Sequence, residues 1–402
     1  MIVSALAVSC TDDELVKGGD KYEVVPDIPV ALSLKIKVAD QMEVQTRLAQ
    51  SDETERTVNK LFVIAFKPSK QSDGAENADA SDDEWSVDNS AFYDTEDGLG
   101  NPIEVGKPQS VEFSMTTGLR RIYVVGNPQS GVGTLSDDEL KNVKTIAALK
   151  ALYSKLSDNL SVERVYFLMT GQAITKEKSE IVTVYKSGDH QGAIREDYTM
   201  ALNHVDARIT FNIIPAVGVT FEPEAYRVIN IPGGTYLFSR EKQNSGDNTW
   251  DYDGAGYAPS NRLSDFTEKD GKSIFEFYIC ENRQNPKQKI STESLLEEGT
   301  YYALREKQEK KLITGTVEGQ KYENGEYVYA NAKSTYVELE GTITYKDDDG
   351  SEVYAKTTYT IHLGNTGNSN TADWLNDLEL VNNYDTERNT HYTYNVKVQS
   401  VD

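Results

Sequence analysis

The stretch Pro29–Phe66 constrains the fold more than any other part of the chain. Its first part alternates apolar with polar or small residues, and this period of two places five apolar side chains on one face of a β-strand: Val30, Leu32, Leu34, Ile36 and Val38. A polar segment with Arg47 and Arg56 follows, and the run Leu61–Phe66 is then apolar on both faces, which predicts a central strand. The stretch therefore predicts a removable first strand and a function in assembly rather than catalysis.

Length and charge limit the classes of function. At 402 residues the chain is long enough for two domains. Its 24 tyrosines and 28 glycines, in a chain that is only 38% hydrophobic, favour short strands and turns. The formal net charge of −24 argues against nucleic-acid binding, because a phosphate backbone requires a basic surface. We interpret the acidic excess as a solvated, self-repelling surface.

The N-terminus predicts a lipid anchor. An apolar run ends at Ser9-Cys10 and is followed at once by the polar and acidic segment Thr11–Glu14, which resembles surface-exported lipoproteins. We expect Cys10 to carry the lipid and residues 1–27 to form a signal remnant and tether; a buried cysteine at an apolar end is the alternative. No other apolar run approaches the roughly 20 residues needed to span a bilayer, so we expect membrane attachment by lipid alone.

The remaining chain predicts two β-rich domains, residues 28–190 and 196–402, joined by a polar linker. A long strand-like run, Tyr198–Ile214, opens the second domain, and Asp347–Gly350 has the residues of a hairpin turn between two further strands. Many short strands separated by polar loops favour a sandwich fold. The two cysteines, Cys10 and Cys280, lie far apart in the sequence, so we expect no disulfide framework.

Two segments of the first domain depart from this strand pattern. We interpret Lys67–Pro102, rich in Asp, Glu, Ser, Asn and Gly, as a long surface insertion. Ser136 and Glu139 have the spacing of a capping box, which predicts the start of a helix. Leucines and a tyrosine at three- and four-residue spacing extend the predicted helical segment to about Leu156.

The sequence contains none of the common catalytic or metal-binding motifs. The sequence has no phosphate-binding loop, zinc motif or nucleophile elbow, so we expect no enzyme and no cofactor. The four histidines are scattered, and none is spaced as a metal pair: His190, His204, His362 and His391. Asp347–Asp349 and the pair Asp251 and Asp253 offer carboxylates for calcium, but neither matches the full calcium loop, and we expect no metal.

Five motifs, in this order along the chain, resemble the fimbrillin superfamily of the Bacteroidetes, whose members build type V pili. They are Gln45–Leu48 with the strand Val58–Phe66, Gly118–Asn127, Phe167–Gly171, Val205–Ile209 and Glu387–Tyr394. The first resembles the family's processing site and first mature strand, and the last resembles its closing strand. His204 stands where the family has an arginine ahead of the fourth motif.

The resemblance implies two transthyretin-like β-sandwich domains with a short helical insertion in the first. It implies a lipoprotein precursor at the outer-membrane surface that an arginine-specific surface protease cuts at Arg47, or alternatively at Arg56. The N-terminal strand then leaves, and a strand of another fimbrial subunit takes its place by donor-strand exchange.

The resemblance also bears on the place of the subunit in the fibre. Stalk subunits of the family carry a C-terminal donor extension, whereas this chain stops at Asp402 directly after the closing strand. We therefore expect a tip or accessory subunit, with a host glycan or protein as a further partner. The alternatives are an unprocessed fimbrial anchor and a monomeric glycan- or protein-binding surface lipoprotein that keeps its N-terminal strand.

Overall fold

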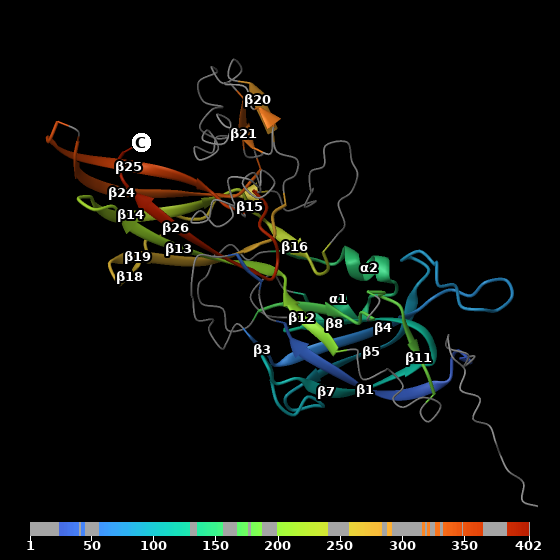
Figure 1. Ribbon diagram of the computed structural model, residues 1–402. Helices are drawn as coiled ribbons and strands as arrows, with labels where there is room; N and C mark the ends of the chain where they lie inside the picture. Colours follow the sequence, from blue (N-terminus) through green and yellow to red (C-terminus); the bar gives the residue numbers. More distant parts are fainter. Residues whose placement is uncertain are drawn as a thin grey trace, which may run out of the picture.

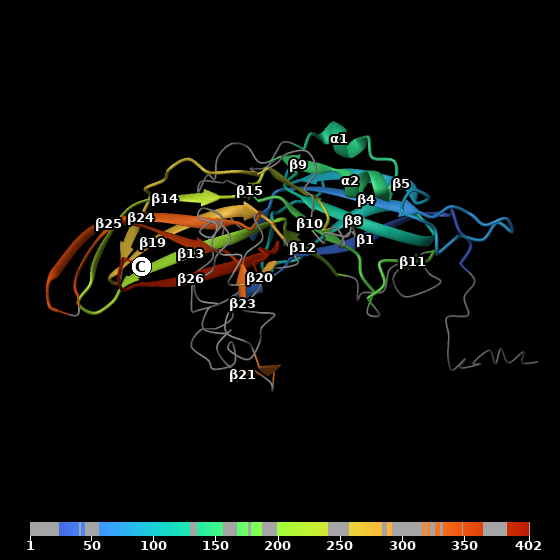
Figure 2. The same ribbon diagram turned by 90° about the horizontal axis from the view of Figure 1, so that it is seen from above.

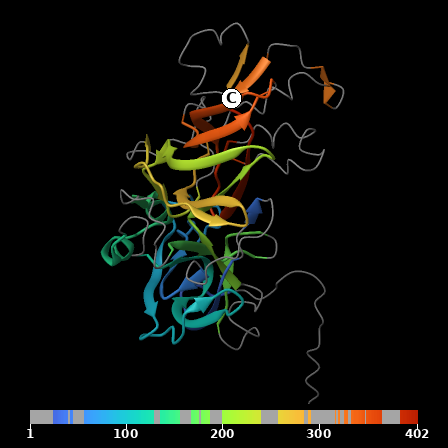
Figure 3. The same cartoon turned by 90° about the vertical axis from the view of Figure 1, so that its left-hand side faces the viewer.

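The computed structural model describes residues 24–39, 42–44, 56–128, 135–155, 167–175, 178–186, 199–239, 257–283, 288–291, 316–317, 320–321, 326–329, 333–347, 349–364 and 384–401. Within them the chain is mostly β-strand with two short helices, which confirms the all-β class. Two sandwiches lie end to end, the N-terminal one blue to green and the C-terminal one mainly yellow-green to red (Figures 1 and 3).

An eight-stranded sheet builds the N-terminal sandwich, in the order β5–β4–β8–β10–β12–β1–β7 with β11 paired to β8. Its strands are β1 (Pro29–Val38), β4 (Lys60–Lys67), β5 (Ser86–Asp94), β7 (Gln109–Thr116), β8 (Gly118–Gly126), β10 (Met169–Gln172), β11 (Val182–Val184) and β12 (Thr199–His204). The interpretation of Lys67–Pro102 as a surface insertion is wrong in part, because β5 pairs with β4 along its length. Trp85, just ahead of β5, is fully buried.

Strand β4 is buried on both faces, as its apolar run predicts. One face, which includes Val63, packs between the two layers of the sandwich against β1 and β7. The other, which includes Phe62 and Phe66, packs in a second cluster with Trp85 and apolar residues of the helices. The helices cover this outer face (Figure 2). A strand that packs against a hydrophobic core on both faces has consecutive apolar residues in its sequence, because the side chains on both faces are buried.

Two short helices form where the capping box predicts a helix start, α1 (Asp137–Lys141) and α2 (Ile146–Ala151). The Ser136 hydroxyl accepts a hydrogen bond from the Glu139 N–H (3.2 Å), and the Ser136 N–H donates to the Glu139 carboxylate (2.8 Å), so the box is confirmed.

The predicted extension of the helical segment to about Leu156 is wrong. The chain leaves the helix after Ala151 and forms β9 (Tyr153–Lys155), which pairs antiparallel with β16 (Gly234–Tyr236). Helical spacing is a local signal, whereas this strand is fixed by a partner far along the chain.

Two facing sheets build the C-terminal sandwich, in the orders β18–β19–β13–β26–β2 and β14–β24–β25. Their strands are β2 (Met42–Val44), β13 (Asp206–Pro215), β14 (Thr220–Ile229), β18 (Thr267–Lys269), β19 (Lys272–Cys280), β24 (Tyr336–Lys346), β25 (Glu352–His362) and β26 (Thr390–Val398). Aromatic rings fill the space between the sheets, with Phe275 stacked 4.0 Å from Tyr226 and 4.8 Å from Phe211 between ring centroids.

Four two-stranded pairs complete the described strands. They are β3 (Thr57–Val58) with β6 (Ile103–Glu104), β15 (Ile231–Pro232) with β17 (Tyr257–Ala258), β20 (Gln288–Ser291) with β23 (Glu326–Tyr329), and β21 (Thr316–Val317) with β22 (Gln320–Lys321). The predicted hairpin turn joins β24 to β25, where the Asp347 N–H donates to the Ser351 carbonyl (3.0 Å).

The chain passes from one sandwich to the other at Val205. The single strand expected over Tyr198–Ile214 is in fact two strands, since β12 belongs to the N-terminal sheet and β13 to the C-terminal one. Val205 between them is buried in the cluster beneath the helices. The expected linker falls mostly on residues outside the described part of the chain.

Candidate functional site

Strand β1 lies between β7 and β12 rather than at the end of the sheet. It pairs antiparallel with β7 along Pro29–Ile36 and parallel with β12 along Lys35–Val38. In Figure 1 it runs from the pole remote from the C-terminal sandwich toward the joint between the two. The parallel pair joins segments that are far apart in the sequence, so β1 binds two strands that do not otherwise pair with each other.

The inward face of β1 forms part of the core, as its alternation predicts. Leu32, Leu34, Ile36 and Val38 are at most 4% exposed, and Val30 is partly buried against the same cluster. Burying an aliphatic side chain contributes about 1.5–3 kcal/mol, so the four buried residues contribute roughly 6–12 kcal/mol before entropic costs. This is comparable with the whole stability of a domain, about 5–15 kcal/mol.

The segment that follows β1 extends into the C-terminal sandwich. The Ala39 N–H donates to the Leu202 carbonyl (2.8 Å), and β2 then adds to the edge of the C-terminal sheet, with Val44 opposite Tyr392 of β26. The residues ahead of Arg47 thus contribute strands to both sheets. A cut after this segment would break its covalent link to the rest of the chain and leave it held to both sandwiches by strand pairing alone.

Strand β7 has a second set of contacts that does not involve β1. The Asn89 side chain donates to the Ser114 carbonyl (2.6 Å), and the Tyr93 hydroxyl donates to the Glu112 carbonyl (2.7 Å). Both donors belong to β5, at the other end of the sheet order. These bonds hold β7 to the sandwich independently of β1.

The turn ahead of β1 is fastened to Thr117, which follows β7. The Asp27 N–H donates to the Thr117 carbonyl (3.0 Å), and the Thr117 N–H donates to the Ile28 carbonyl (2.9 Å). The Thr117 hydroxyl accepts from the Ile28 N–H (3.0 Å) and donates to the Val25 carbonyl (2.6 Å). Asp27 has a φ of 67°, a left-handed conformation that Asp and Asn adopt more readily than most residues.

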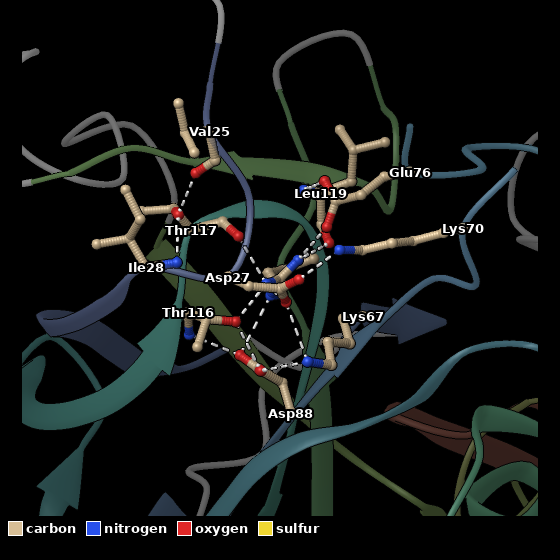
Figure 4. Close-up of polar contacts among 11 residues, drawn as sticks. Val25, Asp27, Ile28, Lys67, Lys70, Glu76, Asp88, Thr116, Thr117 and Leu119 are labelled. Carbon is tan, nitrogen blue, oxygen red and sulfur yellow. Dashed lines mark hydrogen bonds and ion pairs between the residues drawn. The ribbon is translucent and has the colours of Figure 1, made fainter. Parts of the chain in front are cut away.

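The charged side chains of Asp27, Lys67, Lys70, Glu76 and Asp88 gather at this end of the sandwich (Figure 4). The guanidinium of Arg120 lies within 4 Å of the three carboxylates among them. Arg120 is fully buried on β8, and its guanidinium pairs with Glu76 (2.8 Å) and Asp88 (3.1 Å), which are also buried. Its remaining donors reach the carbonyls of Leu119 and Thr117, both at 2.6 Å. An arginine at such a site is tolerated because every donor direction meets an acceptor.

Asp27 joins this cluster from the N-terminal segment. Its carboxylate pairs with Lys70 (2.8 Å) and Lys67 (3.0 Å) and lies 3.9 Å from the Arg120 guanidinium. Hydrogen bonds from Lys70 and Lys67 lower the pKa of Asp27 to about 2. The side chain is therefore ionised throughout the physiological range, although a third of its surface is exposed.

Gly118 explains how Glu76 reaches the cluster. The residue has a φ of 114°, and a Cβ there would collide with the Glu76 carboxylate. With no side chain in the way, Glu76 accepts from the Leu119 N–H (2.6 Å) as well as from Arg120. A glycine directly ahead of Leu119 and Arg120 is thus required by close packing as well as by backbone conformation.

Comparison with known proteins relates the N-terminal sandwich to a protein family. Residues 30–208 match the family model described as the major fimbrial subunit protein, FimA, and the match runs from β1 to the start of β13. Over these residues the chain is similar to fimbrial subunits of this family. This similarity supports a structural or adhesive role at the cell surface, in a fimbrium with other fimbrial subunits. No curated protein sequence matches the chain.

Solved structures similar to this chain come from Porphyromonas, Bacteroides and Parabacteroides. The tip fimbrial protein Mfa3 from Porphyromonas gingivalis, with a C-terminal truncation, is 12% identical with a TM-score of 0.47, over 93% of this chain and 97% of that one. A candidate cell adhesion protein from Bacteroides eggerthii is 15% identical with a TM-score of 0.44, over 94% and 89%. One from Parabacteroides distasonis is 16% identical with a TM-score of 0.44, over 85% of each chain.

Local contacts explain residues in two of the fimbrillin-like motifs of the N-terminal sandwich. Asn127, at a φ of 51°, donates to the carbonyls of Thr57 (2.9 Å) and Phe167 (3.0 Å) and so connects the ends of three segments. Gly171 lies against β12, where a Cβ would collide with the Ala201 carbonyl. Asn127 therefore ties the end of β8 to β3 and to the segment ahead of β10, and Gly171 allows β10 to lie close to β12, which flanks β1.

The closing fimbrillin-like motif lies at the joint between the sandwiches. Arg388 donates to the Leu237 carbonyl (2.8 Å) and pairs with Glu281 (2.5 Å). Asn389, at a φ of 55°, accepts a hydrogen bond from the His204 N–H (3.1 Å) at the end of β12. The start of β26 is thereby held to the N-terminal sandwich, beside the place where β2 pairs.

Several predicted residues fall outside the part of the chain that the structure describes. They are Cys10, Arg47, His190, Asp251, Asp253 and Asp348. Arg56 is described: it is half-buried and directly precedes β3, whose Val58 is fully buried. Neither described helix is long and apolar enough to cross a membrane.

The described histidines and aspartates have structural partners. His391 shares a hydrogen bond with the Thr210 hydroxyl (2.9 Å), and the ring of His362 lies 5.2 Å from that of Tyr336. Asp347 and Asp349 both accept from the Ser351 N–H in the hairpin turn, at 2.9 Å and 2.8 Å. Over the described ranges, no three His, Cys, Asp or Glu side chains gather as ligands for a metal ion.

Proposed function

We propose that the chain is a fimbrial subunit, at the tip or in an accessory position, that assembles by exchange of β1. It is made as a lipoprotein attached through Cys10, is cut after Arg47 by an arginine-specific surface protease, and receives a strand of another subunit in place of β1. The observation that carries the proposal is the position of β1 between β7 and β12, in a segment that lies wholly ahead of Arg47.

The energetics favour replacement over simple loss. Removal of β1 gives up the burial of four aliphatic side chains and the pairing along Pro29–Val38. The lost burial, roughly 6–12 kcal/mol, is too large for an ordinary domain to forgo. An extended segment from another chain restores both the backbone hydrogen bonds and the filled core, as in other cases of β-strand addition.

The surroundings of Arg56 favour Arg47 as the cleaved residue. A protease binds several residues on each side of the cut in an extended conformation, and Thr57 and Val58 are already paired with β6. Cleavage after Arg56 therefore requires that β3 first leave its partner and that Val58 leave the core. Cleavage after Arg47 requires neither step, and the strand on its N-terminal side, β2, ends at Val44, three residues ahead of the cut.

The proposal is tested by mass spectrometry of fibres sheared from the cell surface. We expect a mature N-terminus at Leu48 in the wild type, and loss of the chain from fibres in an Arg47→Gln variant but not in a matched Arg56→Gln variant. A chain in fibres that still begins at Cys10 would contradict cleavage. Recovery of the chain only as a membrane-bound monomer, never in fibres, would favour the alternative of a binding lipoprotein that keeps β1.

The place of the subunit in the fibre stays a prediction. Immunogold labelling against this chain should mark fibre ends or sparse sites for a tip or accessory subunit. Continuous labelling along the shaft would indicate a stalk subunit, and labelling only at the cell surface would indicate an unprocessed anchor. A glycan or protein target is tested separately, by binding of labelled fibres to host cells with and without this chain.

A further inference from the structure

The charged cluster at the pole of β1 is balanced only while the N-terminal segment is present. Three cations, Lys67, Lys70 and Arg120, face three carboxylates, Asp27, Glu76 and Asp88. Asp27 is the one member of this set that lies ahead of the proposed cut. Lys67 lies on β4, Asp88 on β5 and Arg120 on β8. Lys70 and Glu76 lie in the segment between β4 and β5, so all five stay with the subunit after the cut.

Departure of the segment leaves an excess of one positive charge beside a buried guanidinium. Glu76 and Asp88 remain on Arg120, but Lys70 loses its 2.8 Å pair and Lys67 its 3.0 Å pair. Lys67 keeps one carboxylate within 4 Å, Asp88 at 3.9 Å, which also serves Arg120. Cations gathered in a partly enclosed site repel one another, so the site favours an incoming negative charge.

The backbone around Asp27 determines the sequence position at which an incoming strand must carry the negative charge. The first apolar side chain against the core, Val30, follows Asp27 by three residues, and the buried ones then recur at every second position from Leu32. Asp27 reaches both lysines from a left-handed backbone conformation at φ 67°. A short side chain at this conformation places the carboxylate between Lys67 and Lys70.

We propose that the strand of another subunit that replaces β1 carries an aspartate side chain three residues ahead of its alternating apolar run, and that Lys67 and Lys70 select it. This inference rests on the proposed strand exchange and specifies the partner chemistry of the same site. The buried apolar side chains of the strand provide its affinity, and the two lysines require a negative charge at one position of it. A strand with the same apolar pattern but a neutral residue at this position leaves the cationic pole unpaired.

The test uses the full chain with a site for a specific protease placed within residues 47–53. After cutting, the N-terminal fragment stays bound through β1, and added peptides compete with it. The competitors are peptides of residues 24–44 with the natural sequence, with Asp27→Asn, and with Lys35→Gln. Lys35 is exposed on the outward face of β1, so its variant controls for a change of one charge away from the pole.

Release of the labelled fragment is followed by fluorescence anisotropy at pH 7. We expect the Asp27→Asn peptide to require about tenfold more peptide for half-release than the natural one, as for loss of charge-assisted hydrogen bonds, and the Lys35→Gln peptide to match the natural one. Asn keeps the shape of Asp and its tolerance of a left-handed backbone, so only the charge changes. In a Lys70→Gln chain, the natural and Asp27→Asn peptides should differ less in the concentration needed for half-release. The control is Lys269→Gln, at an exposed position of the C-terminal sandwich, which should leave that difference unchanged.

The outcomes separate this inference from the proposed function. Equal release by the natural and the Asp27→Asn peptides would overturn the charge requirement and leave strand exchange standing. Failure of every peptide to release the fragment would overturn strand exchange and the inference with it. A difference between the two peptides that persists unchanged in the Lys70→Gln chain would also overturn the assignment of the lysines as the selecting groups.

Discussion

Replacing Arg120 with methionine should destabilise the N-terminal sandwich strongly. Methionine has a similar length and fills the space, but it leaves the carboxylates of Glu76 and Asp88, 8% and 3% exposed, without their guanidinium. Removing one partner of a buried ion pair costs about 3–5 kcal/mol, because the remaining charge stays desolvated. The carbonyls of Thr117 and Leu119 also lose a donor. We therefore expect the free energy of unfolding to fall by about 3–5 kcal/mol.

Urea unfolding followed by tryptophan fluorescence measures this loss, since Trp85 is buried in the same sandwich. The matched control is Arg262→Met, because Arg262 pairs with Glu340 at 2.9 Å but is 47% exposed, and such pairs contribute about 0–1 kcal/mol. Adding Glu76→Gln and Asp88→Asn to Arg120→Met should recover part of the loss, since no charge is then left unpaired. Equal costs for Arg120→Met and Arg262→Met would refute the reasoning.

Three further predictions concern β1 and its neighbours. Ile36→Ala should cost about 2–5 kcal/mol in urea unfolding, whereas Ser33→Ala on the exposed face should change stability by less than about 0.5 kcal/mol. The pKa of Asp27 is lowered from 3.8 to about 2, so the ionised carboxylate stabilises the fold fully above pH 3.8, and this stabilisation is lost as the pH falls through about 2. The difference in free energy of unfolding between wild type and Asp27→Asn should therefore shrink from pH 3.8 to about pH 2. A difference that stays constant over this range would contradict the pairing. Gly171→Ala should lower the melting temperature because its Cβ collides with the Ala201 carbonyl, and an unchanged temperature would show that β12 can shift.

Local patterns in the sequence account for the faces of the strands but not for their neighbours. The alternation in β1 predicts its buried face, and the continuous run in β4 predicts a strand with core on both sides. The capping box at Ser136 predicts a helix start, because its hydrogen bonds lie within four residues. The place of β1 beside β12 depends instead on a parallel pairing across some 165 residues, which no local period contains.

The sequence does not predict the charged cluster around Arg120, for a related reason. Lys67, Lys70 and Glu76 lie at the start of a polar segment that we interpreted as a surface insertion, and isolated charges in such segments usually face solvent. The arginine inside the strand-like run of β8 was the available signal, since an arginine at a position whose neighbours are buried requires buried carboxylates. Sequence alone does not say which of the 65 acidic residues supply them.

The residues at the joint also needed the structure. The closing motif predicts a strand, but not that Arg388 and Asn389 reach back to Leu237 and to the end of β12. The same holds for β2, whose three residues carry too little pattern to be predicted as a strand. Their partner in β26 lies at the other end of the sequence.

The two-sided pairing of β1 also bears on the route by which one strand can give way to another. If β1 dissociated first, eight residues of β7 and four of β12 would become open strand edges at once. Open edges bind any extended chain, including other unfolded copies, and are a common origin of aggregation. A newcomer that pairs at one end and advances residue by residue, as β1 peels away ahead of it, exposes only a few backbone groups at any moment. The architecture thus favours a concerted, zipper-like displacement over a route through a vacant intermediate.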